Sequence, residues 1–263
     1  MSLVNMPQTS ILKSILAIAL IPFIFMSCGN DDEPIDGSLS TYFNESSLTK
    51  VNELIACASG GQSEVFASST HPIAVFFLPE GNATNFRYFE TDDLTPNNTD
   101  FSAYHEVSLT DVPVFGGFLR YFEQETITTE RWAIVTYQMN GNLHYSNPIR
   151  LKFPEKPTEF NPSLLTFDQT EVLSPRFTWQ DGRTAENAIY FHVITDSNGD
   201  LVSGTYTTEK TWQFYDLSNV VLNIRDVTPT PALIPNEQYQ YHMLAVSLDN
   251  WVNLITQRNF STF

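Results

Sequence analysis

This 263-residue sequence contains five histidines, and one pair of them is a candidate for binding a metal ion. His192 and His242 are this pair, and each falls within a predicted strand. Two imidazoles could begin a metal site, but structural zinc takes four protein ligands, and no cysteine or carboxylate is placed to complete the set. We therefore interpret them as a polar surface pair and predict neither a metal nor another cofactor.

Nucleophilic chemistry has equally little support. Cys57 lies in the apolar stretch 54–58 with no charged activator nearby in sequence, so we expect a buried, unreactive thiol. The chain contains no Gly-x-Ser-x-Gly elbow, no His-Glu-x-x-His and no phosphate-binding glycine loop. We therefore predict no catalytic residues. A hydrolase with an unrecognised site is the third-ranked alternative.

Aromatic side chains offer another kind of site. Trp212, Phe214 and Tyr215 lie in one short segment, and Trp251 follows an Asp-Asn turn. Flat aromatic faces beside loops can stack on sugar rings, so these four residues form a candidate ligand platform. The alternation of Trp212 and Phe214 also suits an inward-facing strand, and core packing is the favoured role.

Cys28 ends a segment of a different kind. A lone Lys13 precedes an apolar run from Ile15 to Met26, and Ser27 and Cys28 follow it. The run is shorter than the ~20 apolar residues that a membrane-spanning helix needs. The segment resembles the signal peptide of a bacterial lipoprotein. That resemblance implies cleavage before Cys28 and attachment of fatty acyl chains, such as palmitate, to this residue.

The acidic run after Cys28 bears on location. Asp31, Asp32 and Glu33 resemble the export signal of surface lipoproteins in the Bacteroidota. The resemblance implies a lipid-anchored protein of the outer membrane, exposed at the cell surface. Retention on the periplasmic face is the alternative, in which the acidic run is only a solvated tether.

The charge of the chain excludes one class of partner. Thirteen Lys and Arg residues oppose thirty Asp and Glu residues, for a net charge of −17. Such a surface repels phosphate backbones, so we expect no nucleic-acid partner. It also repels an anionic leaflet, so the membrane contact would be the lipid anchor.

The rest of the chain shows an all-β pattern. Short apolar or alternating runs rich in Phe, Tyr, Val, Ile and Thr are separated by Gly, Pro, Asn and Asp. Asn140-Gly141 between the predicted strands 131–139 and 143–153 indicates a tight hairpin. Pro154 and Pro157 cannot donate ladder hydrogen bonds and mark a joint between two halves. Each half has the length and strand number of an immunoglobulin-like sandwich.

The second half carries a more specific motif. Leu233, Pro235 and Tyr239 form a Leu-x-Pro-x-x-x-Tyr pattern that resembles the opening of the sixth strand in fibronectin type III domains. There the tyrosine forms a corner: its ring enters the core and its hydroxyl bonds to upstream backbone. Alternation then predicts that Tyr239, Tyr241, Met243 and Ala245 face inward. The resemblance also implies that Phe177 and Trp179, and Ile189, Phe191 and Val193, face the core, and that His192 and His242 lie on neighbouring strands and point outward.

We therefore predict two tandem antiparallel β-sandwiches after a signal peptide and a tether. The segments are a lipoprotein signal peptide at 1–27, an acidic flexible tether at 28–45, an immunoglobulin-like sandwich at 46–153 and a fibronectin type III-like sandwich at 158–263. The favoured function is non-enzymatic: the sandwiches bind or scaffold another surface or outer-membrane protein. A glycan-binding accessory lipoprotein of a polysaccharide-uptake system is the alternative.

Overall fold

The computed structural model describes residues 37–61, 66, 71–153, 155–225 and 232–263. Residues 34–263 belong to one compact unit. The predicted signal peptide, Cys28 and the acidic run Asp31, Asp32 and Glu33 lie outside the described residues. In the described part, no helix has the length and apolar character needed to cross a membrane.

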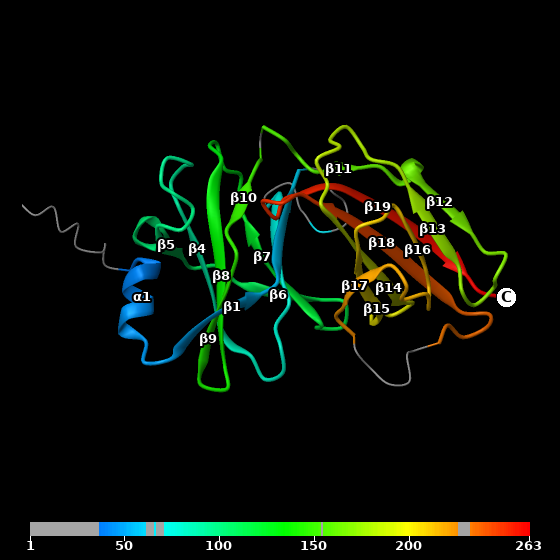
Figure 1. Ribbon diagram of the computed structural model, residues 1–263, viewed down its shortest axis with the longest axis horizontal. Helices are drawn as coiled ribbons and strands as arrows, with labels where there is room; N and C mark the ends of the chain where they lie inside the picture. Colours follow the sequence, from blue (N-terminus) through cyan, green and yellow to red (C-terminus); the bar gives the residue numbers. More distant parts are fainter. Residues whose placement is uncertain (1–36, 62–65, 67–70, 154, 226–231) are drawn as a thin grey trace, which may run out of the picture. The chain divides into compact units, whose positions relative to one another are not determined.

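The first half forms two sheets that face each other (Figure 1). Sheet I contains, in spatial order, β1 (Thr49–Leu54), β9 (Asn142–Ser146), β8 (Arg131–Met139), β4 (Thr84–Glu90) and β5 (His105–Val107), and β10 (Ile149–Leu151) also pairs with β8. Sheet II contains β2 (Ala56–Gly60), β3 (Ile73–Phe77), β7 (Leu119–Gln124) and β6 (Asp111–Val114). Sheet II therefore has the A-B-E-D order of an immunoglobulin sandwich, and β4, β8 and β9 take the C, F and G places.

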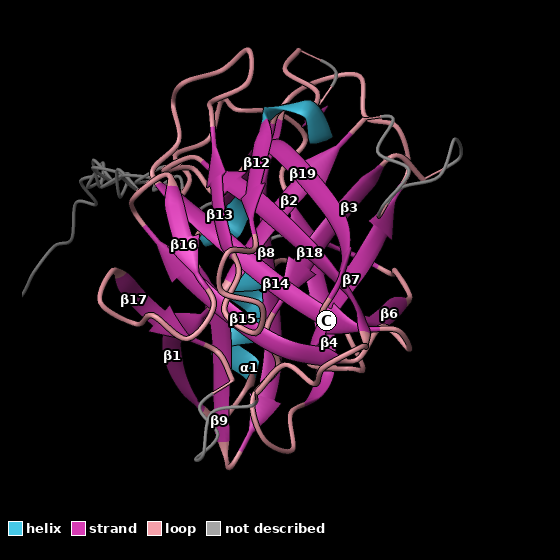
Figure 2. Ribbon diagram, turned by 90° about the vertical axis from the view of Figure 1, so that its right-hand side faces the viewer, coloured by secondary structure: helices cyan, strands magenta, loops and turns pink. Residues whose placement is uncertain are grey.

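The second half repeats the two-sheet plan. Sheet III contains, in spatial order, β11 (Glu159–Phe160), β19 (Val252–Ser261), β18 (Gln238–Val246), β14 (Ile189–Asp196), β15 (Leu201–Thr207) and β17 (Val220–Asn223). Sheet IV contains β12 (Leu165–Asp168), β13 (Arg176–Trp179) and β16 (Thr211–Gln213). Strands dominate the described chain (Figure 2), and the predicted all-β tandem sandwiches are confirmed. The remaining elements are the helix α1 (Leu39–Glu45) and the short 3₁₀ turns η1 (Phe101–Ala103) and η2 (Pro162–Leu164).

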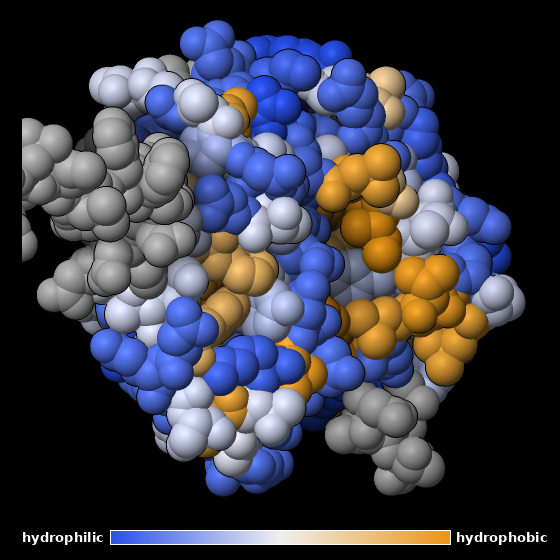
Figure 3. Space-filling model, turned by 60° about the vertical axis from the view of Figure 1, so that its left-hand side comes forward, coloured by the Kyte–Doolittle hydropathy of each residue, from blue (hydrophilic) through white to orange (hydrophobic). Residues whose placement is uncertain are grey.

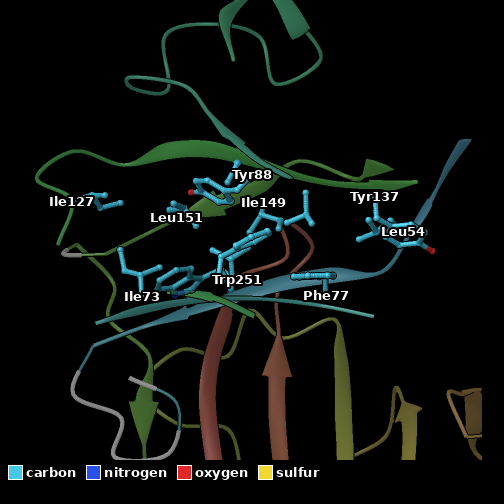
Figure 4. Close-up of a cluster of buried hydrophobic side chains, with 14 residues drawn as sticks. Leu54, Ile73, Phe77, Tyr88, Ile127, Tyr137, Ile149, Leu151 and Trp251 are labelled. Carbon is cyan, nitrogen blue, oxygen red and sulfur yellow. The ribbon is translucent and has the colours of Figure 1, made fainter. Parts of the chain in front are cut away.

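Each sandwich has its own apolar core. The first core lies between sheets I and II and includes Ile73, Phe77, Tyr88 and Leu151. Figure 4 shows that Trp251, which comes from the second half, lies among these side chains. The second core lies between sheets III and IV and contains, among others, Phe177, Trp179, Tyr190, Ile194, Trp212, Tyr239, Tyr241, Met243 and Ala245.

A third core joins the two halves. It brings Phe76 and Leu119 of sheet II together with Phe191, Val193 and Leu244 of sheet III. The central strands of both sheets are consequently buried on both faces, and every residue of β3 is buried. A continuous apolar run such as that of β3 is typical of a strand covered on two sides. We call this set of side chains the shared core.

The structure corrects the expected core face of β14. The resemblance to fibronectin type III domains places Ile189, Phe191 and Val193 in the core of the second sandwich, but Phe191 and Val193 lie in the shared core instead. Tyr190 and Ile194 face the second core. Because the side-chain period of a strand is two, a choice that is wrong by one residue exchanges the two faces. Because both faces of this strand carry apolar residues, the sequence does not show which face points into which core.

Helix α1 corrects the predicted tether at 28–45. Ser38 caps the helix, its side chain accepting a hydrogen bond from the Thr41 backbone N–H at 3.1 Å. Leu39 is fully buried and packs with Phe89 and Ile134 on the outer face of sheet I. The ordered fold therefore begins by Ser38, not at residue 46. A helix of seven residues is too short to produce a clear helical periodicity of apolar residues in a β-rich sequence.

Candidate interaction surface

Tyr239 forms the corner of the second sandwich. Its ring is 5 % exposed, and its hydroxyl accepts a hydrogen bond from the Ile234 backbone N–H at 2.8 Å. Leu233 is buried in the second core, whereas Pro235 lies in the exposed turn between Leu233 and Tyr239. These are the contacts that the resemblance to fibronectin type III domains implies, and their role is structural.

Removing the corner hydroxyl tests its structural value. We expect Tyr239→Phe to lower the free energy of unfolding by about 1 kcal/mol, because the Ile234 N–H loses its acceptor. Tyr239→Leu also removes ring contact with Phe260, so it should cost about 2–4 kcal/mol. Denaturant unfolding of the three proteins measures both values. A Tyr239→Phe curve that coincides with the parent curve would contradict the assignment.

The prediction of an aromatic ligand platform is wrong. Trp212, Phe214 and Trp251 are 2 %, 1 % and 0 % exposed, and of the four only Tyr215 reaches solvent, at 41 %. The Trp212 ring lies stacked on that of His192, with centroids 5.3 Å apart, in the second core. Trp212 points inward from β16, and Phe214, in the turn just after this strand, is buried in the same core, so their flat faces are covered and cannot stack on a sugar. The feature that favoured glycan binding is therefore absent from these residues.

The histidine pair is also placed differently from the expectation. His192 is fully buried in the second sandwich, where Nδ1 lies 2.8 Å from the Tyr241 hydroxyl and Nε2 lies 2.9 Å from the Thr207 hydroxyl. Burial lowers the pKa of His192 to about 3. The ring is a neutral, hydrogen-bonded member of the core, not a surface group.

His242 lies on the opposite face of sheet III. Its ring is 3 % exposed, within the shared core, and lies 5.7 Å from the rings of Phe66 and Phe115, centroid to centroid. Among the described residues, neither ring nitrogen finds a hydrogen-bond partner, and burial lowers the pKa of His242 to about 4. Because His192 and His242 point to different faces, they cannot share a ligand. Across the described residues, no group of His, Cys, Asp and Glu side chains is arranged to hold a metal ion.

Cys57 is a partly buried thiol against the shared core. Burial raises its pKa to about 12, so it stays protonated at neutral pH. The thiol is less buried than the sequence predicts, and its side chain packs against the shared core.

A hollow of about 280 Å³ lies where the two halves meet. Residues from β1, β2 and the link between them, and from β14, β15 and β17, line it, so both sandwiches build it; we call it the junction hollow. Its lining includes Glu53, Ile55, Cys57, Ile189, Tyr206 and Leu222. Figure 3 shows apolar side chains gathered around a hollow on one face of the molecule.

Exposed apolar residues continue beside the junction hollow. On β17, Val221 is 58 % exposed and Leu222 40 % exposed, and Leu217 in the preceding turn is 50 % exposed. The sequence alone predicted no surface at these residues. The run Val220-Val221-Leu222 was an available signal, since three consecutive apolar residues in a short strand cannot all face one core.

Comparison with known proteins gives limited information. No family model and no curated protein matches the chain. Among solved structures, a two-domain fibronectin type III segment of chicken tenascin is 13 % identical, covers 80 % of this chain and 98 % of its own, and has a TM-score of 0.25. The FN1–FN3 domains of chicken CNTN1 are 11 % identical, cover 82 % and 68 %, and have a TM-score of 0.29. The strand order and the Tyr239 corner, not these likenesses, carry the fold assignment.

Proposed function

We propose that this protein is a non-enzymatic lipoprotein of the outer membrane whose tandem sandwiches bind or scaffold a protein partner at the cell surface. Cys28 would carry the acyl chains, and Asp31, Asp32 and Glu33 would direct surface export. The single observation that carries the binding role is the shared core, which joins two sandwiches and leaves an apolar hollow at their junction.

The shared core supports this role through rigidity. Two sandwiches that share buried side chains present their surfaces in one fixed geometry, which lowers the ordering cost of binding. Apolar patches on the surface of a unit with a large net charge are typical of protein-interaction sites. Sandwich loops and edges are, in addition, common places for recognition on a rigid scaffold.

The early start of the fold limits how far the sandwiches would lie from the membrane. If Cys28 is lipidated, the stretch up to Ser38 spans at most about 35 Å even when fully extended. Acyl chains contribute ~0.8 kcal/mol per buried methylene, so two or three chains would anchor the protein stably. The binding surface would then be presented close to the outer leaflet.

Replacing the lipidated residue tests the anchor. We expect Cys28→Ala in the full chain to abolish incorporation of labelled palmitate. The protein should also leave the membrane fraction, because the acyl chains on Cys28 would be its anchor. Cys57→Ala is the matched control, since these are the two cysteines of the chain, and it should leave both readouts unchanged. Membrane retention of the unlipidated Cys28→Ala protein would contradict the proposal.

Neutralising the acidic run tests export separately. We expect the triple variant Asp31→Asn, Asp32→Asn, Glu33→Gln to keep its lipid but to lose accessibility to protease added to intact cells of a Bacteroidota host. The same number of charges removed from a loop, at Asp92, Asp93 and Asp100, provides the control. Equal accessibility of the two variants would mean that the run is only a solvated tether.

A further inference from the structure

We propose that the junction hollow and β17 bind an extended, apolar segment of a partner protein that carries lysine or arginine. This inference rests on the proposed protein-binding function and names its surface and the chemistry of its partner. Three features support it: the construction of the hollow, the exposed edge beside it, and the charge around it.

The hollow requires both halves of the molecule. Ile55 and Cys57 line it from the first half, and Ile189, Tyr206 and Leu222 line it from the second. Its volume of about 280 Å³ accommodates apolar side chains of a guest segment, and the lining is largely apolar. A segment bound there would contact both sandwiches at once, so the shared core must be intact for the site to exist.

The apolar surface extends along the edge of sheet III. Residues 215–222 contribute four of the exposed large hydrophobic side chains in the described part: Tyr215, Leu217, Val221 and Leu222. β17 is the terminal strand of sheet III in the described residues, so its outer edge can offer backbone hydrogen bonds to an added strand. The pairing of β17 with β15 shifts in register between Tyr206 and Thr207, which limits strand addition to a short stretch. Side-chain burial would therefore contribute most of the contact.

The charge around the site selects the partner. Glu53 lines the hollow and is exposed, and none of the lining residues in the described part is Lys or Arg. In the turn that leads into β17, hydrogen bonds from the Ser218 side chain and backbone lower the pKa of Asp216, so this carboxylate stays ionised at neutral pH. With a net charge of −17, the protein attracts cationic segments and repels acidic ones.

Defined peptides test the proposal with the full-length Cys28→Ala chain, which is expected to be free of lipid. The probes are fluorescent ten-residue peptides with alternating Val/Lys, Val/Glu and Ser/Lys residues, and anisotropy reports binding. We expect measurable binding of the Val/Lys peptide alone. Leu222→Asp and Val221→Asp should each weaken this binding about tenfold or more. Leu248→Asp is the matched control, because Leu248 is 90 % exposed on the turn between β18 and β19, and it should bind as the parent does.

A charge reversal adds an independent readout. Glu53→Lys should weaken binding of the Val/Lys peptide and strengthen binding of the Val/Glu peptide. Equal binding of the Val/Lys and Val/Glu peptides, or no binding of any peptide, would overturn the proposal. So would binding that Leu222→Asp, Val221→Asp and Leu248→Asp affect equally; that result would place binding elsewhere and leave the broader protein-binding function standing. Thermal unfolding of each variant verifies that the fold is retained.

Discussion

Trp251→Ala is expected to lower the free energy of unfolding by about 3–5 kcal/mol, the usual cost of truncating a fully buried tryptophan. Trp251 belongs to the second half by sequence but fills the core of the first, where it is 0 % exposed. Its indole N–H donates to the Lys156 carbonyl at 2.9 Å, and its backbone forms a bridge with Ala58. Loss of the side chain therefore removes core packing together with the hydrogen bond to Lys156, whereas the backbone bridge to Ala58 does not depend on the indole. Denaturant unfolding measures the change.

Two further variants make this expectation specific. Leu248 lies in the turn that leads to Trp251 and is 90 % exposed. Leu248→Ala should therefore change the free energy of unfolding by less than about 0.5 kcal/mol. A Cβ at Gly60 would come within 2.7 Å of the Trp251 ring, so Gly60→Ala should cost about 1–3 kcal/mol through overpacking.

A double-mutant cycle then tests contact between these two residues. In the Trp251→Ala background, the methyl group that Gly60→Ala adds enters the space left by the indole, so this substitution should cost clearly less there than in the parent. Equal costs in both backgrounds would show that Gly60 and Trp251 do not touch. A cost of Trp251→Ala no larger than that of Leu248→Ala would mean that the tryptophan does not fill the first core.

Acidification is expected to destabilise the fold steeply below about pH 6.5, the ordinary pKa of histidine in an unfolded chain. Burial lowers the folded-state pKa of His242 to about 4 and that of His192 to about 3. Between these values and 6.5 the unfolded chain binds protons that the folded protein does not. The free energy of unfolding therefore falls as pH falls, by about 1.4 kcal/mol per pH unit for each histidine.

His242→Leu isolates one of the two contributions. No described residue forms a hydrogen bond with either nitrogen of His242, so leucine can replace it in the shared core without breaking a polar contact to any of them. We expect the pH dependence between about pH 5 and 6 to fall by about 1.4 kcal/mol per pH unit, the contribution of one buried histidine. Urea unfolding at several pH values measures the slope. His105→Gln is the control at a half-exposed histidine, and a slope that His242→Leu leaves unchanged would contradict burial of the neutral ring.

Local sequence patterns determined the strands of this protein with good accuracy. The strand expected at 131–139 is β8 with the same bounds. Asn140 and Gly141 adopt the positive φ values, 50° and 78°, that a tight hairpin between β8 and β9 requires. The Tyr239 corner was likewise readable, because its motif fixes a turn and an adjacent inward-facing residue within a few positions of the chain.

Tertiary structure alone decided what each strand face contacts. Alternation separates a buried face from a solvated one, but β14 is apolar on both faces, and only the docking of sheet II on sheet III assigned Phe191 to the shared core. The same contact buried His242, which therefore could not form an outward pair with His192. Trp251 entered the core of the other sandwich for a related reason: its burial depends on a surface far away in sequence. Local patterns encode strand propensity, whereas the identity of the covering layer depends on long-range packing between sheets.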